Sequence, residues 1–114
     1  MKAIIEWLTE EQGGRLHPPS GDGPSPYLPL IRFPDEPTWP GDADWSLKVR
    51  KERTLRNPDR WIADVDFLFE GAPRHELREG REFELHEGGK CVARGRLAGE
   101  SALMLVAGQD VASA

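Results

Sequence analysis

The sequence contains a single cysteine, Cys91, among its 114 residues, which excludes an internal disulfide. Histidine is also scarce, and we expect His17, His75, His86 and Cys91 to provide no pair of Cys or His ligands of the kind, roughly two to five residues apart, that zinc sites usually show. We therefore expect no metal site and no cofactor. The position of Cys91 just after a glycine-rich turn predicts a small core residue, facing inward together with Ala93.

Long hydrophobic runs are absent too. The longest candidate, residues 102–107, is far shorter than the ~20 apolar residues of a membrane-spanning helix. No charged-then-apolar leader precedes the domain, so we expect a cytoplasmic protein without membrane contact. The sequence also lacks a Gly-x-x-x-x-Gly-Lys-[Ser/Thr] phosphate loop, which argues against a bound nucleotide cofactor.

The composition is that of one small globular domain. Hydrophobic residues make up 38% of the chain and charged residues 31%, which predicts a folded core and a well-solvated exterior. The formal net charge of −5 argues against general affinity for nucleic acid, because neutralising phosphates requires clustered Lys and Arg.

Apolar and polar residues alternate with a period of two, which is typical of half-buried strands. We expect strands over residues 3–8, 27–33, 45–50, 61–70, 82–86 and 91–97. The fourth of these is predicted to be the longest, with its odd-numbered residues from Trp61 to Phe69 on the core face and Ile62 on the opposite face. Trp7 and Trp45 are also expected in the core by their phase. The pattern predicts an all-β fold.

We expect a single closed six-stranded antiparallel β-barrel over residues 1–99, since closure removes exposed strand edges. Residues 100–114 form a tail that the sequence leaves open as an extra strand, a short helix or a frayed end. The oligomeric state is also left open.

Two glycine-rich turns and a Tyr-x-Pro segment stand out within this pattern. The first turn is Glu11-Gln12-Gly13-Gly14-Arg15, the segment is Tyr27-Leu28-Pro29, and the second turn lies in Glu87-Gly88-Gly89-Lys90-Cys91-Val92-Ala93-Arg94-Gly95. In order and spacing these motifs resemble the C-terminal β-barrel of elongation factor Tu, over residues 3–98. The chain departs from that family's pattern at Pro26, Leu30 and Ala93.

The resemblance implies a freestanding barrel of the translation-factor type. In elongation factor Tu this barrel contacts aminoacyl-tRNA, its own GTPase domain and an exchange factor. The resemblance implies that five residues match loops near the tRNA side, with Arg15 and Lys90 keeping a charge suited to phosphate: Gly14, Arg15, Gly88, Gly89 and Lys90.

A basic stretch is the main asymmetry of charge, and it lies between Trp45 and Trp61. It suggests either an RNA surface with base stacking or a solvated hairpin tip, and its candidate contacts are Lys48, Arg50, Lys51 and Arg53. Trp39 lies between Pro37 and Pro40 in a turn-rich stretch, which makes it a candidate anchor for a protein partner.

These observations favour a non-enzymatic binding module that docks a protein or RNA of the translation apparatus. An alternative is a protein-interaction factor outside translation, such as an inhibitor or immunity-type protein. A further alternative is an enzyme or small-molecule-binding barrel with Asp64, Asp66 and a nearby histidine as its site. That alternative requires a concave pocket with convergent polar groups.

Overall fold

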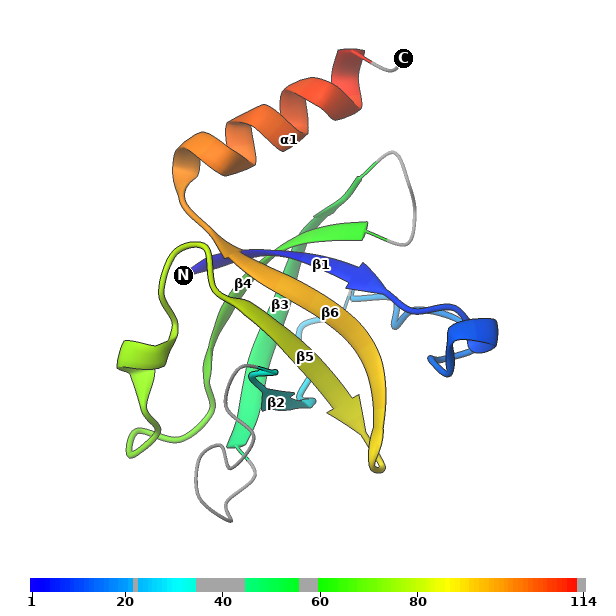
Figure 1. The fold of residues 1–114 in the computed structure, drawn as a ribbon, viewed down its shortest axis with the longest axis vertical. Helices are drawn as coiled ribbons and strands as arrows, with labels where there is room; N and C mark the ends of the chain where they lie inside the picture. The colour runs from blue at the N-terminus through cyan, green and yellow to red at the C-terminus, as the bar shows by residue number, and fades with distance from the viewer. Residues whose placement is uncertain (22, 35–44, 56–59, 113–114) are drawn as a thin grey trace.

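The computed structural model describes residues 1–21, 23–34, 45–55 and 60–112, which form a small barrel with a helix at its C-terminal end (Figure 1). The strands are β1 (Lys2–Trp7), β2 (Leu30–Arg32), β3 (Trp45–Thr54), β4 (Arg60–Phe67), β5 (Glu82–Glu87) and β6 (Lys90–Ala98). Two short 3₁₀ helices, η1 (Glu10–Gln12) and η2 (Arg74–Glu76), lie in connections, and the helix α1 (Glu100–Ala112) follows β6.

The strands pair in the closed order β1-β4-β3-β2-β5-β6, and every pairing is antiparallel. The first strand closes the barrel because it pairs with β4 on one side and with β6 on the other. The all-β, six-stranded antiparallel barrel predicted from the sequence is therefore confirmed.

Side chains fill the inside of the barrel. Trp7 and Trp61 contact each other at a ring distance of 4.8 Å, and Trp45 packs partly buried against Phe67 at 6.3 Å. The largest fully buried side chains come from all six strands and the loop after β2: Ile5, Ile31, Phe33, Leu47, Val49, Trp61, Val65, Phe67, Phe83, Leu85, Val92 and Leu97. Any site of the described residues must accordingly lie on the outside of the barrel.

The predicted fourth strand differs from the observed one in two respects. The longest strand is β3 with 10 residues, whereas β4 has 8 and ends at Phe67. Phe69 therefore lies in the following turn and is 57% exposed instead of facing the core. Ile62 lies on the opposite face as expected, yet it is buried.

A β-bulge changes the predicted orientation of Cys91. Leu85 pairs with Ala93, but the next residue, His86, pairs with Cys91, so Val92 is an extra residue in β6. Val92 and Ala93 are both fully buried, and Cys91 is only half-buried. The expectation that Cys91 faces inward with Ala93 is wrong, because the bulge reverses the inward and outward alternation between them.

The tail after Gly99 is the helix α1, one of the three forms that the sequence left open. It extends away from the end of the barrel (Figure 1), and Met104 and Leu105 are exposed on it. Among the described residues, no helix has the length and apolar character needed to cross a membrane.

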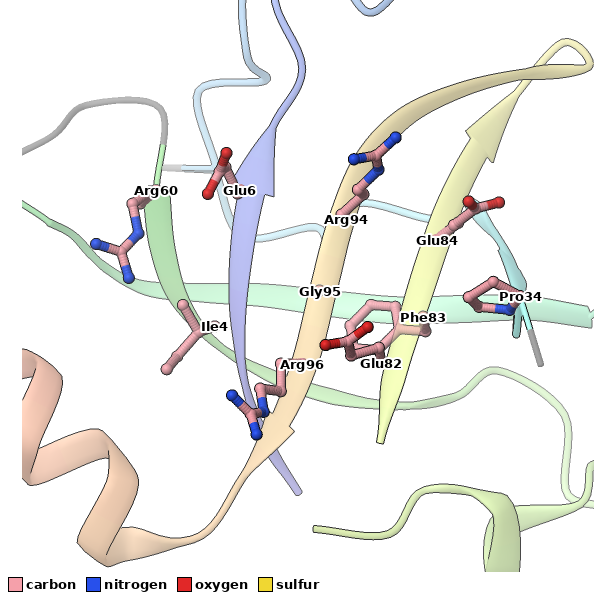
Figure 2. A pocket seen from close by; sticks show the side chains of 10 residues that line it. All are labelled: Ile4, Glu6, Pro34, Arg60, Glu82, Phe83, Glu84, Arg94, Gly95 and Arg96. Atoms are coloured by element: carbon pink, nitrogen blue, oxygen red, sulfur yellow. The ribbon is translucent and has the colours of Figure 1, made fainter. Parts of the chain in front are cut away.

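Gly95 has a packing role that gives a first prediction. The ring of its cross-strand neighbour Phe83 lies against it (Figure 2), and a Cβ at residue 95 would come within 2.2 Å of that ring. We expect Gly95→Ala to lower the free energy of unfolding by about 1–3 kcal/mol, because the ring must move within a filled core. Urea denaturation measures this effect.

The matched control is Gly71→Ala, since a Cβ at residue 71 meets no atom within 4 Å. This variant should stay within about 0.5 kcal/mol of the parent. Equal stabilities of the two variants would contradict the packing role of Gly95.

Candidate functional site

The structure brings the two glycine-rich turns together. The first turn follows η1, whose Thr9 and Gln12 form a capping box, and Gly13 ends this short helix with a φ of 86°. Gly14 lies so close to the backbone of Leu8 that a Cβ would come within 2.2 Å of the Leu8 carbonyl oxygen. Residue 13 therefore requires glycine because its φ is positive, and residue 14 requires glycine because it lies against the Leu8 backbone.

The second turn joins β5 to β6. Gly88 and Gly89 have φ values of 54° and 84°. Positive φ at both central residues is the geometry of the tight hairpin turns that match the twist of the flanking strands. The turn is a tight two-residue connection.

Two contacts join the two turns directly. Arg15 Nη1 lies 2.6 Å from Glu87 Oε2, and Lys90 Nζ donates a hydrogen bond to the Gly14 carbonyl oxygen at 3.2 Å. The Tyr27 hydroxyl donates to the same Glu87 oxygen. The guanidinium of Arg15 also lies over the Tyr27 ring, 5.9 Å from its centroid. We call this surface, residues 13–17, 27–28 and 87–90, the paired-turn face.

Tyr27 anchors the paired-turn face to the barrel. Its backbone exchanges two hydrogen bonds of 2.9 Å with Val49, and its ring packs against Trp7 at 5.4 Å. Burial and the neighbouring Glu87 carboxylate raise the pKa of the Tyr27 hydroxyl well above its ordinary range. Burial alone would lower the pKa of Arg15, but the hydrogen bond and charge of Glu87 raise it, so the Arg15 guanidinium stays charged.

Of the ten residues predicted to bind a partner, five lie on the paired-turn face: Gly14, Arg15, Gly88, Gly89 and Lys90. A further four lie together on β3: Lys48, Arg50, Lys51 and Arg53. Trp39 lies outside the described residues.

Two of the four cations of β3, Arg50 and Lys51, hold the preceding loop through contacts within the chain. Lys51 Nζ donates to the Ser20 carbonyl oxygen at 2.8 Å and lies 5.6 Å from the centre of the Trp61 ring. Arg50 donates to the Pro24 carbonyl oxygen at 3.2 Å. These side chains hold the loop before Tyr27 against the barrel, so this strand is not a bare basic strip.

Two exposed leucines on the paired-turn face were missed by sequence reasoning. Leu16 is 70% exposed and directly follows Arg15, and Leu28 is 49% exposed and directly follows Tyr27. Because Arg15 and Tyr27 contact each other, the two leucines border the same polar cluster. The sequence signal was an apolar residue inside a Pro- and Gly-rich loop, which is easily assigned to turn packing.

A shallow groove of about 550 Å³ crosses the outer surface of β1, β6 and β5 (Figure 2). Ile4, Phe83 and Gly95 contribute its apolar part. Four of its charged residues belong to a cross-strand row in which basic and acidic side chains alternate: Arg60, Glu6, Arg94 and Glu84. Arg32 continues this row on β2, outside the groove, and the groove also includes the cross-strand pair Glu82 and Arg96. Opposite charges at paired positions stabilise a sheet, so this row has a structural role by itself.

Asp64 and Asp66 do not form the paired acids that an enzyme site would require. Their side chains are 48% and 46% exposed. Asp64 Oδ1 lies 3.4 Å from the N-terminal amine, and Asp66 Oδ1 lies 3.0 Å from Arg74 Nε. Each carboxylate thus has its own cation on a solvated surface.

No protein-family model matches the sequence, and no curated protein matches it. The resemblance to the elongation factor Tu barrel therefore stays a prediction that is based on the turn motifs.

The single tyrosine gives the second prediction. The folded protein keeps the Tyr27 hydroxyl protonated to a higher pH than the unfolded chain does. The contribution of this proton to the free energy of unfolding is therefore fully present below the ordinary pKa of about 10, and it is lost as the pH rises through the pKa of the folded protein. We expect the phenolate absorbance of the folded protein to appear only well above pH 10, and Glu87→Gln to move its onset to lower pH. An ultraviolet absorbance titration measures the onset.

Glu10→Gln, which removes another acid near the first turn, is the control and should leave the onset unchanged. An onset that is the same in Glu87→Gln and the parent would show that the carboxylate does not hold the Tyr27 proton.

Proposed function

We infer that the protein is a non-catalytic binding module that docks a protein partner through the paired-turn face. The observation that carries this is the pair of exposed leucines beside a fixed polar cluster. Apolar anchors bordered by ordered polar groups are the usual anatomy of a protein interface.

The charges of the paired-turn face favour a protein over RNA. Arg15 is paired with Glu87, and Lys90 donates to a backbone carbonyl, so both cations already have intramolecular partners. The groove on the outer surface of β1, β6 and β5 carries acids and bases in alternation, and the whole chain has a net charge of −5. A phosphate backbone gains most from clustered cations without competing acids.

The resemblance to the elongation factor Tu barrel supports a partner from the translation apparatus. The same paired-turn face could be used outside translation by an inhibitor or immunity-type protein, and the identity of the captured partner distinguishes these two roles.

The third prediction tests the docking face. Tagged protein is used to capture partners from a lysate of its source organism, with half of the lysate treated with nuclease. We expect a partner that survives nuclease and is lost from Leu16→Asp and Leu28→Asp. With the purified partner, Leu16→Ala should weaken binding about fivefold or more, as for an interface anchor.

Phe69→Asp is the matched control, because Phe69 is 57% exposed on the connection after β4 and should not affect capture. Capture that disappears with nuclease and with Arg53→Ala would assign RNA as the ligand and reject the proposal. Capture that is equal in the leucine variants and the control would reject this face as the docking site.

A further inference from the structure

Three side chains with metal-binding atoms meet on the outer face of the β5–β6 hairpin. Glu84 and His86 are two residues apart on β5, on either side of the buried Leu85. Cys91 pairs with His86 across the hairpin. The carboxylate, imidazole and thiol atoms all lie within 4.8 Å of one another.

The bulge at Val92 creates this cluster. Without the extra residue, Cys91 would share the inward face of Ala93, and its sulfur would lie in the core. With the bulge, Cys91 turns outward beside His86. Bulges often re-aim a side chain next to a functional site. His86 and Cys91 are five residues apart, a spacing that the sequence shows. Sequence reasoning missed the cluster because it placed Cys91 on the inward face, and only the bulge brings its thiol to the same face as His86.

The distances fit a zinc ion after small side-chain rotations. Zinc binds thiolate sulfur at about 2.3 Å and imidazole nitrogen or carboxylate oxygen at about 2.0–2.2 Å, so two ligand atoms on one tetrahedral zinc are about 3.3–3.7 Å apart. His86 Nε2 and Glu84 Oε1 are 3.0 Å apart, close to that separation. Cys91 Sγ lies 3.4 Å from the Ala93 carbonyl oxygen and can rotate toward the other two.

The donor types select a borderline-soft metal. A thiolate and an imidazole favour zinc over magnesium or calcium, which prefer all-oxygen sites. The register places Arg94 and Arg32 on either side of Glu84. These cations compete with a metal for the carboxylate, which weighs further against ions that depend on oxygen ligands alone.

We propose that Glu84, His86 and Cys91 form a Zn²⁺ site with three protein ligands. Cys91 binds as the thiolate and its proton passes to solvent, so the two anionic ligands and the neutral imidazole balance the charge of the ion. Three protein ligands leave a fourth position for water or a ligand atom. A hollow of about 270 Å³, lined by Leu30, Arg32, His86 and Gly89, lies beside His86 on that outer surface.

The site adjoins the paired-turn face, because Glu87 directly follows His86. A bound zinc would join the two strands of the hairpin next to the Gly88-Gly89 turn. The inference stands on its own geometry and does not depend on the proposed partner.

The fourth prediction concerns the metal alone. Untagged protein with a phosphine reductant is titrated with Zn²⁺ by calorimetry and with Co²⁺ by absorbance. We expect one ion per chain and a thiolate-to-cobalt charge-transfer band. Cys91→Ser should abolish the band, and His86→Gln should weaken Zn²⁺ binding at least about tenfold, since even losing a hydrogen-bond partner of a metal ligand costs that much.

His75→Gln is the matched control, because His75 Nε2 also lies near a carboxylate, 3.3 Å from Glu76 Oε1, but has no thiol beside it. It should bind Zn²⁺ as the parent does. Absence of stoichiometric binding by the folded parent, or binding that is unchanged in Cys91→Ser and His86→Gln, would overturn the proposal. If a variant fails to fold, the charge-transfer band of the parent decides whether the thiolate is a ligand.

Partner capture is measured separately with metal-stripped protein. Loss of the zinc site therefore leaves the docking proposal intact, and failure to capture a partner leaves the metal titration interpretable.

Discussion

The pairing of β1 with β6 is the constraint on which the rest of the structure depends. It closes the barrel, because β1 already pairs with β4 on its other side. The pairing extends past the end of β1 through the hydrogen bond from the Leu8 amide to the Val92 carbonyl oxygen, at 2.9 Å. The first glycine-rich turn begins three residues after Leu8 and therefore lies beside the β5–β6 hairpin, although the two are far apart in the sequence.

The paired-turn face shows how one contact network can serve both folding and recognition. The Arg15–Glu87 pair and the Tyr27 hydroxyl fix two turns that lie far apart in the sequence. The pairing with Glu87 also occupies the positive charge of Arg15, which a phosphate would otherwise bind. What remains exposed at this face includes the apolar side chains of Leu16 and Leu28, and for this reason the geometry favours a protein partner.

The outer surface of the barrel is organised by strand register. Opposite charges occupy paired positions across β4, β1, β6, β5 and β2, an arrangement that stabilises a sheet. Within this surface the bulge at Val92 introduces a local change of phase that brings a thiol beside an imidazole and a carboxylate. Without this extra residue Cys91 would face the core. With it, Cys91 is half-buried on the outer face, where we propose that it binds zinc.

The sequence by itself determined the strand alternation, the closed antiparallel barrel and the two positive-φ glycine turns, because these depend on local periodicity and local backbone freedom. It also indicated that Gly14, Arg15 and Lys90 belong to turns. Only the tertiary structure decided that these turns meet, that β4 ends before Phe69, and that Cys91 faces outward. The physical reason is that strand register and bulges are fixed by pairing between residues far apart in the chain, and a shift of one residue reverses which face a side chain occupies.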